Sequence, residues 1–431
     1  MVRMGRPAAH LALAGLLFGN AGCQPRPEPR PQTQSGESLS QAIQAAVVGT
    51  ALASDYAALG NRPLWVTPQG PTPAAYAAVE TLARARADGF DPADYGAEQA
   101  AALVAAAPSD AARLARLELM LSDGVARYIH DLRTRGTAPG WTDPDLSRRA
   151  TDPHALMSEA AAAPSRQAWL TDAVRMHPLY EALRAAGTHS EEEARVVRAN
   201  LDRLRWLPAD PGERYILVDA AAALLTMVEH GQATGTMRVI VGKPGMATPM
   251  LAGLIRYAAY NPYWNLPPDL SAQRALRVLH DGPGVLASER LEILADWSPE
   301  AAVLDPASVD WRAMGAGQLG PRLRQLPGKR NMMGSVKFML PNPLGIYLHD
   351  TPDKAAFQQT ARRLSSGCVR VEDPARLAAW LFGKTPEPTG LAEERIDLPR
   401  PVPVYVVYLT AAPEAGKVAL RPDPEGRDAL T

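Results

Sequence analysis

One cysteine and one histidine in the C-terminal half of the chain have the types and surroundings that thiol chemistry needs. Cys368 follows the short run Ser365-Ser366-Gly367, and His349 lies nineteen positions before it (368 − 349). A thiolate is a nucleophile, and an imidazole within reach can take the thiol proton and return it to a leaving amine. Gly367 allows a tight turn whose amides can stabilise an oxyanion. The pattern indicates a Cys–His acyl-transfer site.

A structural role for the same thiol is the alternative. The chain has two cysteines, Cys23 and Cys368. Cys23 ends a predicted export leader, so Cys368 is left without a disulfide partner in the chain. A lone thiol is often an inert buried residue. The SSGCVRV run, with a histidine on the strand before it, favours the reactive interpretation.

Local signals place both side chains at strand ends. The stretch SVKFMLPNPLGIYLHD predicts a hairpin with its turn at 342–345 and His349 at the end of the second strand. SSGCVRV predicts a turn and a short strand. A helix then follows, with Asp373 as its N-cap and Pro374 at its first position. We expect His349 and Cys368 to converge at the rim of a sheet.

The rest of the chain predicts an α+β, multidomain fold. Residues 39–207 are Ala-rich with apolar side chains at three- and four-residue steps, which predicts a helical scaffold domain. Residues 208–431 contain short β-branched and aromatic runs, which predict a β-rich catalytic domain. Within it, residues 268–320 break the strand pattern with DLSAQRALRVL and LASERLEILADW, both of which read as helical. We expect this insertion to form a helical cap that acts as a lid.

The N-terminus predicts export. Residues 1–23 combine a basic start with a short apolar run, and residues 24–38 form a Pro-rich linker. Cys23 follows small residues as in a lipoprotein signal, although Asn20 stands where such a signal normally has Leu. Ordinary cleavage is the alternative. The expected location is the periplasm, with Cys23 as the one potential lipid anchor to the membrane.

Charge and motifs exclude other classes. The 45 basic and 46 acidic residues balance, without a basic stripe, so nucleic acid is not expected as a partner. The sequence has no HExxH motif and no second cysteine that could complete a zinc site. We therefore expect neither a metal nor another cofactor.

At YLHDTP and SSGCVRVED the sequence resembles the L,D-transpeptidases with a YkuD catalytic domain, and in particular the large periplasmic YcbB-type branch. The resemblance extends over nearly the whole chain from about Ala53, through these further stretches: ADGFDPADY, LSDGVARYIHDL, NLDRLRWLP, RVIVGKPGMATP, NPYWNLPP, QLPGKRNMMGSVKFMLPN and PVPVYVVYLT. One departure concerns the peptidoglycan-binding module of that branch. HPLYEALRAAG runs directly into THSEEEARVV, which leaves no room for it.

The resemblance implies an enzyme that cross-links peptidoglycan. Cys368 would be the nucleophile and His349 the general base. The carbonyl of Asp350 would orient the imidazole, and the amides of Gly367 and Cys368 would form the oxyanion hole. The donor would be a stem tetrapeptide and the acceptor a diamino-acid amine, giving 3–3 cross-links. Carbapenems are expected inhibitors, and cell-wall synthases are expected protein partners.

Five further residues are predicted at the substrate site. Tyr347 and Trp264 match aromatic positions that line the family's active site, with a place in the core as the alternative. Ser366 adds a small side chain that leaves room for substrate. Arg370 would bind a substrate carboxylate or pair with Glu372. Asn331 would fix a turn or contact substrate.

Two other functions stay open at this point. With water as acceptor, the same thiol chemistry would make the protein an L,D-carboxypeptidase or an amidase. A non-catalytic wall-binding or scaffolding protein is the alternative from another class. The intact pairing of Cys368 with His349 argues against that last class.

Overall fold

The computed structural model describes residues 33–146, 152–298, 300–318 and 320–430. The predicted leader, residues 1–23, and the first part of the predicted linker lie outside the described residues. The linker was expected to extend to residue 38, but the first helix already begins at Thr33. Its last six residues are therefore helical. No helix among the described residues has the length and apolar character needed to cross a bilayer.

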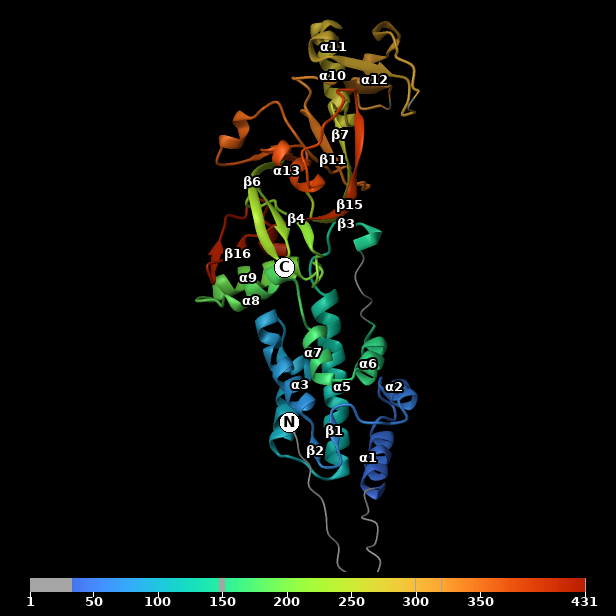
Figure 1. The fold of residues 1–431 in the computed structure, drawn as a ribbon, viewed down its shortest axis with the longest axis vertical. Helices are drawn as coiled ribbons and strands as arrows, with labels where there is room; N and C mark the ends of the chain where they lie inside the picture. Colours follow the sequence, from blue (N-terminus) through green and yellow to red (C-terminus); the bar gives the residue numbers. More distant parts are fainter. Residues whose placement is uncertain (1–32, 147–151, 299, 319, 431) are drawn as a thin grey trace, which may run out of the picture.

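Helices build the N-terminal half of the elongated molecule (Figure 1). The longest, α5 (Ala111–Thr134), starts at Asp110, whose side chain accepts the Arg113 amide hydrogen, and it buries a stripe that includes Leu117 and Leu121. Around it lie α1 (Thr33–Ala46), α2 (Ala53–Ala58), α3 (Pro73–Ala83), α4 (Ala97–Ala105), α6 (Pro153–Ala162) and α7 (Arg166–Ala173). Two further helices, α8 (Pro178–Ala185) and α9 (Glu191–Leu204), lead to the catalytic domain. The predicted helical scaffold is confirmed.

A sheet that closes on itself forms the C-terminal half. Hydrogen-bonded neighbours run in the order β11, β12, β14, β6, β5, β4, β15, β7, and β7 pairs in turn with β11. The strands are β4 (Arg214–Asp219), β5 (Leu224–Glu229), β6 (Gln232–Gly242), β7 (Leu251–Tyr260), β11 (Val336–Met339), β12 (Leu348–His349), β14 (Val369–Val371) and β15 (Glu394–Val407). The short β13 (Arg363–Ser365) adds to β6. The predicted β-rich domain is confirmed.

The scaffold contributes a strand to this sheet. β3 (Trp141–Thr142), which comes from within the predicted scaffold domain, pairs in parallel with the start of β7. One continuous hydrophobic core, which includes Leu121 and Val404, runs through both halves. The predicted boundary at 207/208 therefore does not separate two independent cores. The physical reason is that the free edge of β7 needs a partner, and the chain leaving α5 supplies it.

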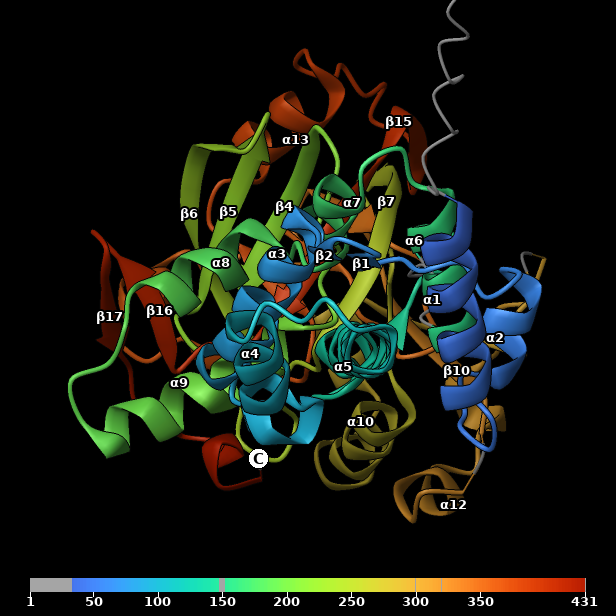
Figure 2. The same ribbon diagram turned by 90° about the horizontal axis from the view of Figure 1, so that it is seen from below.

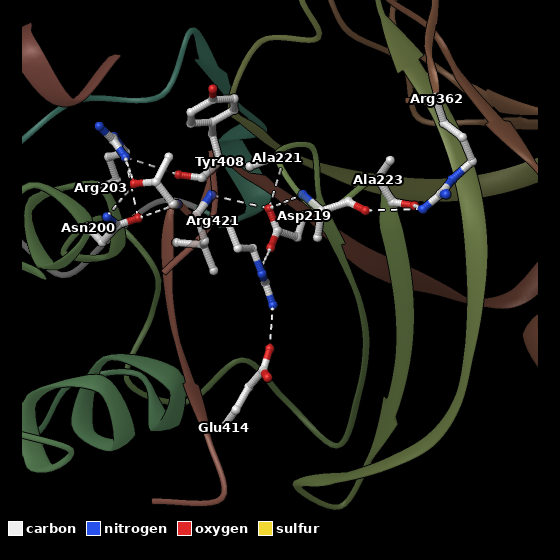
Figure 3. Close-up of polar contacts among 12 residues, drawn as sticks. Asn200, Arg203, Asp219, Ala221, Ala223, Arg362, Tyr408, Glu414 and Arg421 are labelled. Carbon is white, nitrogen blue, oxygen red and sulfur yellow. Dashed lines mark hydrogen bonds and ion pairs between the residues drawn. The ribbon is translucent and has the colours of Figure 1, made fainter. Parts of the chain in front are cut away.

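Polar contacts hold helix α9 against the end of the sheet (Figure 3). Its capping serine, Ser190, accepts the Glu193 amide hydrogen. Buried Asn200 donates to the Thr410 hydroxyl at 2.7 Å, and buried Arg203 pairs with Asp428 at 2.6 Å. The tail after β15 thus contacts helix α9. This tail contains β16 (Ala411–Glu414) and β17 (Lys417–Leu420).

The insertion folds as a lobe with its own core. Its elements are β8 (Trp264–Asn265), α10 (Pro268–Asp281), α11 (Gly284–Glu289), β9 (Leu291–Leu294), α12 (Trp311–Gly315) and β10 (Arg322–Gln325). The strands form a separate sheet in the order β8, β10, β9. A second hydrophobic cluster, which includes Ile293 and Leu323, lies between this sheet and its helices. Figure 1 shows the lobe at the end of the molecule opposite the scaffold.

One expectation for this lobe was wrong. LASERLEILADW was predicted to be helical throughout, but α11 ends at Glu289 and residues 291–294 form β9. Leu291 and Ile293 point to the lobe core while Glu292 points away, which is the two-residue period of a strand. Pairing with β10 therefore outweighs the helical propensity of this short stretch.

Candidate active site

The predicted hairpin brings His349 into the sheet. β11 and β12 are antiparallel, with Lys337 directly opposite His349. On the other side β12 runs parallel to β14, with His349 beside Arg370. Residues two apart on a strand share a face, so Tyr347 and Cys368 flank this pair on the same face. The register therefore puts the strands that carry the two motifs side by side.

The imidazole of His349 is buried and held at one nitrogen. Its side chain is 2% exposed, and its Nδ1 lies 2.5 Å from the carbonyl oxygen of Asp350. A carbonyl only accepts hydrogen bonds, so this contact places the proton on Nδ1 and leaves Nε2 as a base. Burial lowers the pKa of His349 to about 3, and the nearby Arg370 and Lys337 charges contribute in the same direction. The ring is neutral at neutral pH.

The carboxylate of Asp350 supports this arrangement from outside the reacting face. It accepts hydrogen bonds from the Ser335 amide and hydroxyl, from Thr351 and from the Lys354 ammonium. Burial opposes ionisation, but these donors hold the pKa of Asp350 below its usual range. Gly334 makes the approach feasible, because a Cβ there would lie 2.4 Å from the carboxyl carbon. Asp350 thus acts through its backbone carbonyl, with the carboxylate fixing the loop.

The thiol of Cys368 is half-buried and lies 3.5 Å from the Gly345 carbonyl oxygen. Burial raises its pKa, while hydrogen bonds from the Tyr347 amide and hydroxyl and the charge of Arg370 oppose that rise. The resting group is therefore the thiol, and it needs a base to become a nucleophile. The neutral imidazole on the same face is suited to that role.

The turn before the thiol differs from expectation in one respect. Gly367 has φ +118°, which favours glycine, and its carbonyl accepts a hydrogen bond from Thr248 at 2.7 Å. Its amide, however, donates to the Ser365 hydroxyl at 3.2 Å, and that hydroxyl donates to the Cys368 carbonyl. Gly367 was expected to supply one of two oxyanion donors, but this amide is occupied. The Cys368 amide has no hydrogen-bond acceptor among the described residues.

Of the two alternatives for Arg370, the structure excludes the internal one. Glu372 pairs with Arg238, whose Nε lies 2.9 Å from a carboxylate oxygen. The Nε of Arg370 is buried and has no hydrogen-bond partner within the described parts of the chain. A guanidinium beside His349 is therefore left to pair with something other than Glu372. This agrees with a substrate carboxylate as its partner.

The remaining predicted residues lie in different parts of the structure. Tyr347 lies at the site, with its ring centroid 5.7 Å from that of His349. Ser366 is exposed on the turn next to the thiol. Trp264 instead packs against the lobe core, which agrees with its core alternative. Asn331 is 2% exposed and its amide bonds the carbonyls of three residues in the lobe connections, Pro262, Gln325 and Leu326. These bonds agree with the alternative in which Asn331 fixes the turn.

Sequence reasoning missed Lys337 and Thr248, and it missed the hydrogen-bonding role of Ser365. Lys337 faces His349, Thr248 holds the Gly367 carbonyl, and Ser365 bridges the turn. Strand alternation in SVKFML could have placed Lys337 on the reacting face. Nothing local marks Thr248, since it lies far from the motif in sequence. No group of three or more His, Cys, Asp or Glu side chains suited to a metal occurs in the described part of the chain.

Comparison with known proteins identifies both halves. Residues 213–404 match the family model of the L,D-transpeptidase catalytic domain (YkuD), and residues 50–186 match that of a scaffold domain. A Haemophilus influenzae protein provisionally named an L,D-transpeptidase is 33% identical over 238 residues. That match covers 53% of this chain and 47% of the relative, so the chain spans about half of the relative's length. Residues 213–404 of the chain are therefore similar to an L,D-transpeptidase catalytic domain.

Solved structures with local similarity come from the same family. One is an L,D-transpeptidase from Mycobacterium smegmatis, 17% identical, with a TM-score of 0.23; it covers 45% of this chain and 58% of its own. Another is an L,D-transpeptidase in complex with imipenem, 16% identical, with a TM-score of 0.22 and coverage of 45% and 59%.

Proposed function

We propose that this protein is a peptidoglycan L,D-transpeptidase that forms 3–3 cross-links through a thioester on Cys368. The observation that carries the proposal is the shared face of a protonated thiol and a buried neutral imidazole, within a catalytic domain of this family. The scaffold and the lobe would present two stem peptides to that face.

In the proposed acylation step, His349 acts as the base for Cys368. His349 Nε2 takes the proton of Cys368 as Sγ attacks the carbonyl carbon of the third residue of a stem tetrapeptide. The oxyanion that forms is stabilised by the Cys368 amide. The imidazolium then gives its proton to the nitrogen of the terminal D-Ala. The C–N bond breaks, D-Ala leaves as a neutral amine, and a thioester remains.

In the transfer step, the proton moves from the acceptor amine to His349 and then to the sulfur of Cys368. An acceptor amine of a diamino acid on a second stem attacks the thioester carbonyl, and His349 accepts the proton that the amine loses. The C–S bond breaks and the thiol of Cys368 is restored by that proton. Arg370, which does not pair with Glu372, would bind a carboxylate of one of the stems beside the reacting carbonyl. No metal or redox group enters these steps.

Export to the periplasm belongs to the same proposal. It is supported by the basic and apolar residues of segment 1–23 and by the location of peptidoglycan outside the cytoplasm. Lipid attachment at Cys23 and ordinary cleavage predict different masses for the mature chain. Intact-mass measurement of the protein purified from membranes distinguishes them.

Analysis of muropeptides by mass spectrometry tests the activity. Incubation with disaccharide tetrapeptides should give 3–3 dimers and free D-Ala, and Cys368→Ala should give neither while keeping its thermal transition. Tripeptides without dimers would instead make the protein an L,D-carboxypeptidase. A carbapenem adduct on the Cys368→Ala variant in intact-mass analysis would contradict the assignment of the nucleophile.

His349→Ala gives a second test. Loss of a general base typically slows catalysis about 10²- to 10⁴-fold, so acylation of Cys368 by a carbapenem should slow by that range at neutral pH. Stopped-flow or intact-mass kinetics measure it. Equal rates for the variant and the parent would mean that another group activates the thiol.

A further inference from the structure

Two cationic residues flank the histidine of the candidate active site. Lys337 and Arg370 are the register partners of His349 on β11 and β14, and residues paired in this way lie on one face of a sheet. The Asp350 amide donates to the Val336 carbonyl one residue further along. Lys337 and His349 therefore form a non-hydrogen-bonded pair, in which the Cα atoms are only about 4.5 Å apart. The lysine thus stands directly beside the imidazole.

These two charges oppose the protonation that general-base catalysis requires. Burial is the main cause that lowers the pKa of His349, and both charges act in the same direction. Asp350 is the nearby anion that acts in the opposite direction. Tyr347 and Cys368 on the same face are neutral at neutral pH, because burial raises the pKa of each. An uncompensated ammonium on β11 would therefore weaken His349 further as a base.

The carboxylate of Glu393 compensates the cation on β11. One of its oxygens lies 2.6 Å from the Nζ of Lys337, whose side chain is 9% exposed. Within the described residues this is the one carboxylate that forms a salt bridge with the lysine. The side chain of Glu393 is 37% exposed, so water screens part of its charge. We therefore expect a moderate compensation rather than a complete one.

Contacts at the lobe connection hold this ion pair in place. The other carboxylate oxygen of Glu393 accepts the Tyr263 amide hydrogen at 3.2 Å, and the Tyr263 carbonyl accepts from Lys337 Nζ at 3.3 Å. The Glu393 amide donates to the Asn261 carbonyl at 2.9 Å. The Asn261 side chain in turn donates to the Leu391 carbonyl in the loop before Glu393. Both partners of the ion pair are thus fixed to the segment that leads into the lobe.

We propose that Glu393 is a positioning residue for the reaction, which acts through Lys337 and keeps His349 able to accept the proton of Cys368. The proton moves from Sγ to Nε2, and the imidazolium that results is a new positive charge beside the lysine. A carboxylate on the ammonium offsets this repulsion. Because Lys337 also holds the lobe connection at Tyr263, the carboxylate allows this contact to persist without loss of the base. The proposal rests on His349 being the base of the proposed function.

Alkylation of Cys368 by iodoacetamide at pH 7 tests this role, because its rate reports the thiol and its base without any peptidoglycan. Glu393→Gln keeps an acceptor for the Tyr263 amide but removes the charge. We expect it to slow alkylation about three- to tenfold, the effect of lowering the basicity of His349 by about half to one pKa unit. Adding Lys337→Met to Glu393→Gln should bring the rate back to within about twofold of the parent.

Three further variants separate this charge effect from a loss of structure. Lys337→Met alone should be no more than about twofold slower than the parent, because it removes the cation that opposes the base. The Glu393 charge also acts on Arg322 of the lobe, so adding Arg322→Gln to Glu393→Gln should not restore the rate. In a His349→Ala background, Glu393→Gln should no longer slow alkylation, because the base through which it acts is gone.

The rescue by Lys337→Met decides the proposal. A rate for Glu393→Gln within about twofold of the parent, or a double variant no faster than Glu393→Gln, overturns it. If Glu393→Gln lacks the thermal transition of the parent, Lys337→Met alone decides, and a loss of more than about twofold in that variant overturns the role. If the rescue holds but muropeptide analysis finds no 3–3 dimers, the positioning role stands and the proposed cross-linking function fails.

Discussion

The catalytic sheet is joined to its two neighbours in opposite ways. Towards the scaffold, a shared hydrophobic core, strand β3 and the buried contacts of α9 tie the two parts together. Towards the lobe, the two cores are separate, and the connections at 261–263 and 326–331 are fixed by polar side chains. Figure 2, which views the molecule along its length, shows the scaffold helices gathered across one end of the sheet.

The two joints should differ in whether they can open without unfolding the domains on either side. Apolar burial is lost only when large surfaces separate, so the scaffold joint should unfold together with the sheet. Hydrogen bonds at the lobe joint can be exchanged for bonds to water at modest net cost, so this joint can open without unfolding either side. The proposed transpeptidase activity would need both properties, because the base must stay fixed while two large substrates enter and leave.

The largest effect is expected from breaking the scaffold joint at Arg203. This side chain is 1% exposed and pairs with Asp428, so Arg203→Ala removes one partner of a buried ion pair. Such changes cost about 3–5 kcal/mol in unfolding free energy. Chemical denaturation measures it. Arg195→Ala, which removes an exposed contact to the Asp428 carbonyl, should cost less than about 0.5 kcal/mol. Similar losses in the two variants would contradict the rigid joint.

A pH effect of the next size is expected at His177, which caps α8 and packs against Tyr215 of the catalytic sheet. Burial lowers the pKa of His177 to about 4, below the ordinary 6.5. The unfolded chain therefore binds this proton first, and stability is full above pH 6.5 and falls as the pH drops towards 4. The loss reaches about 3 kcal/mol.

His177→Asn should remove most of that slope, because asparagine still caps the helix but does not titrate. Urea unfolding at pH 7, 5.5 and 4.5 measures it. His280→Asn is the control, since this lobe histidine lies at the surface with its side chain 87% exposed. A slope that persists in His177→Asn would assign it to other groups.

A smaller, local effect is expected from the lobe joint. Asn331→Ala removes three hydrogen bonds to the connecting carbonyls and one from the Met333 amide. Leaving such groups unpaired costs about 1–3 kcal/mol, but we expect the cost to appear as local opening. Hydrogen exchange should rise in 262–268 and 325–334 while the main thermal transition hardly moves. Gln318→Ala, at an exposed position of the lobe, should change neither. A loss of global stability would show that the lobe joint is also rigid.

The smallest effect on the main fold is expected from removing the lobe. Asn265 and Arg324 are cross-strand partners, so a short Gly-Ser linker can replace 266–323. The two cores are separate, and the unfolding free energy of the remainder should change by no more than about 1 kcal/mol. Acylation of Cys368 by a carbapenem should persist. The dimer-to-tripeptide ratio should fall, because water then reaches the thioester. An unchanged ratio would mean that the lobe is not a lid.

The parts of this architecture that were predictable carry strong local signals. Neighbouring residues mark the turn at 342–345 and the helix start at Asp373. The convergence of Cys368 and His349 follows, because each ends up beside a strand end of the same sheet. These features need only short-range sequence information.

The parts that were missed depend on distant partners. β3 and β9 are strands of two and four residues whose pairing is decided by exposed edges far away in sequence. The freedom of Arg370 from Glu372 depends on Arg238, which comes from another strand of the sheet. No local pattern contains these relations.

Strand β7 connects the scaffold, the His349 hairpin and the lobe. Its first residues pair with β3 from the scaffold, its last residues pair with β11 of the His349 hairpin, and the lobe connection begins immediately after it. A pull between scaffold and lobe would load these strands lengthwise, where many hydrogen bonds share the load and must yield together. Such a force would pass beside His349, and the hydrogen bonds of the lobe connections would break before those of the strands.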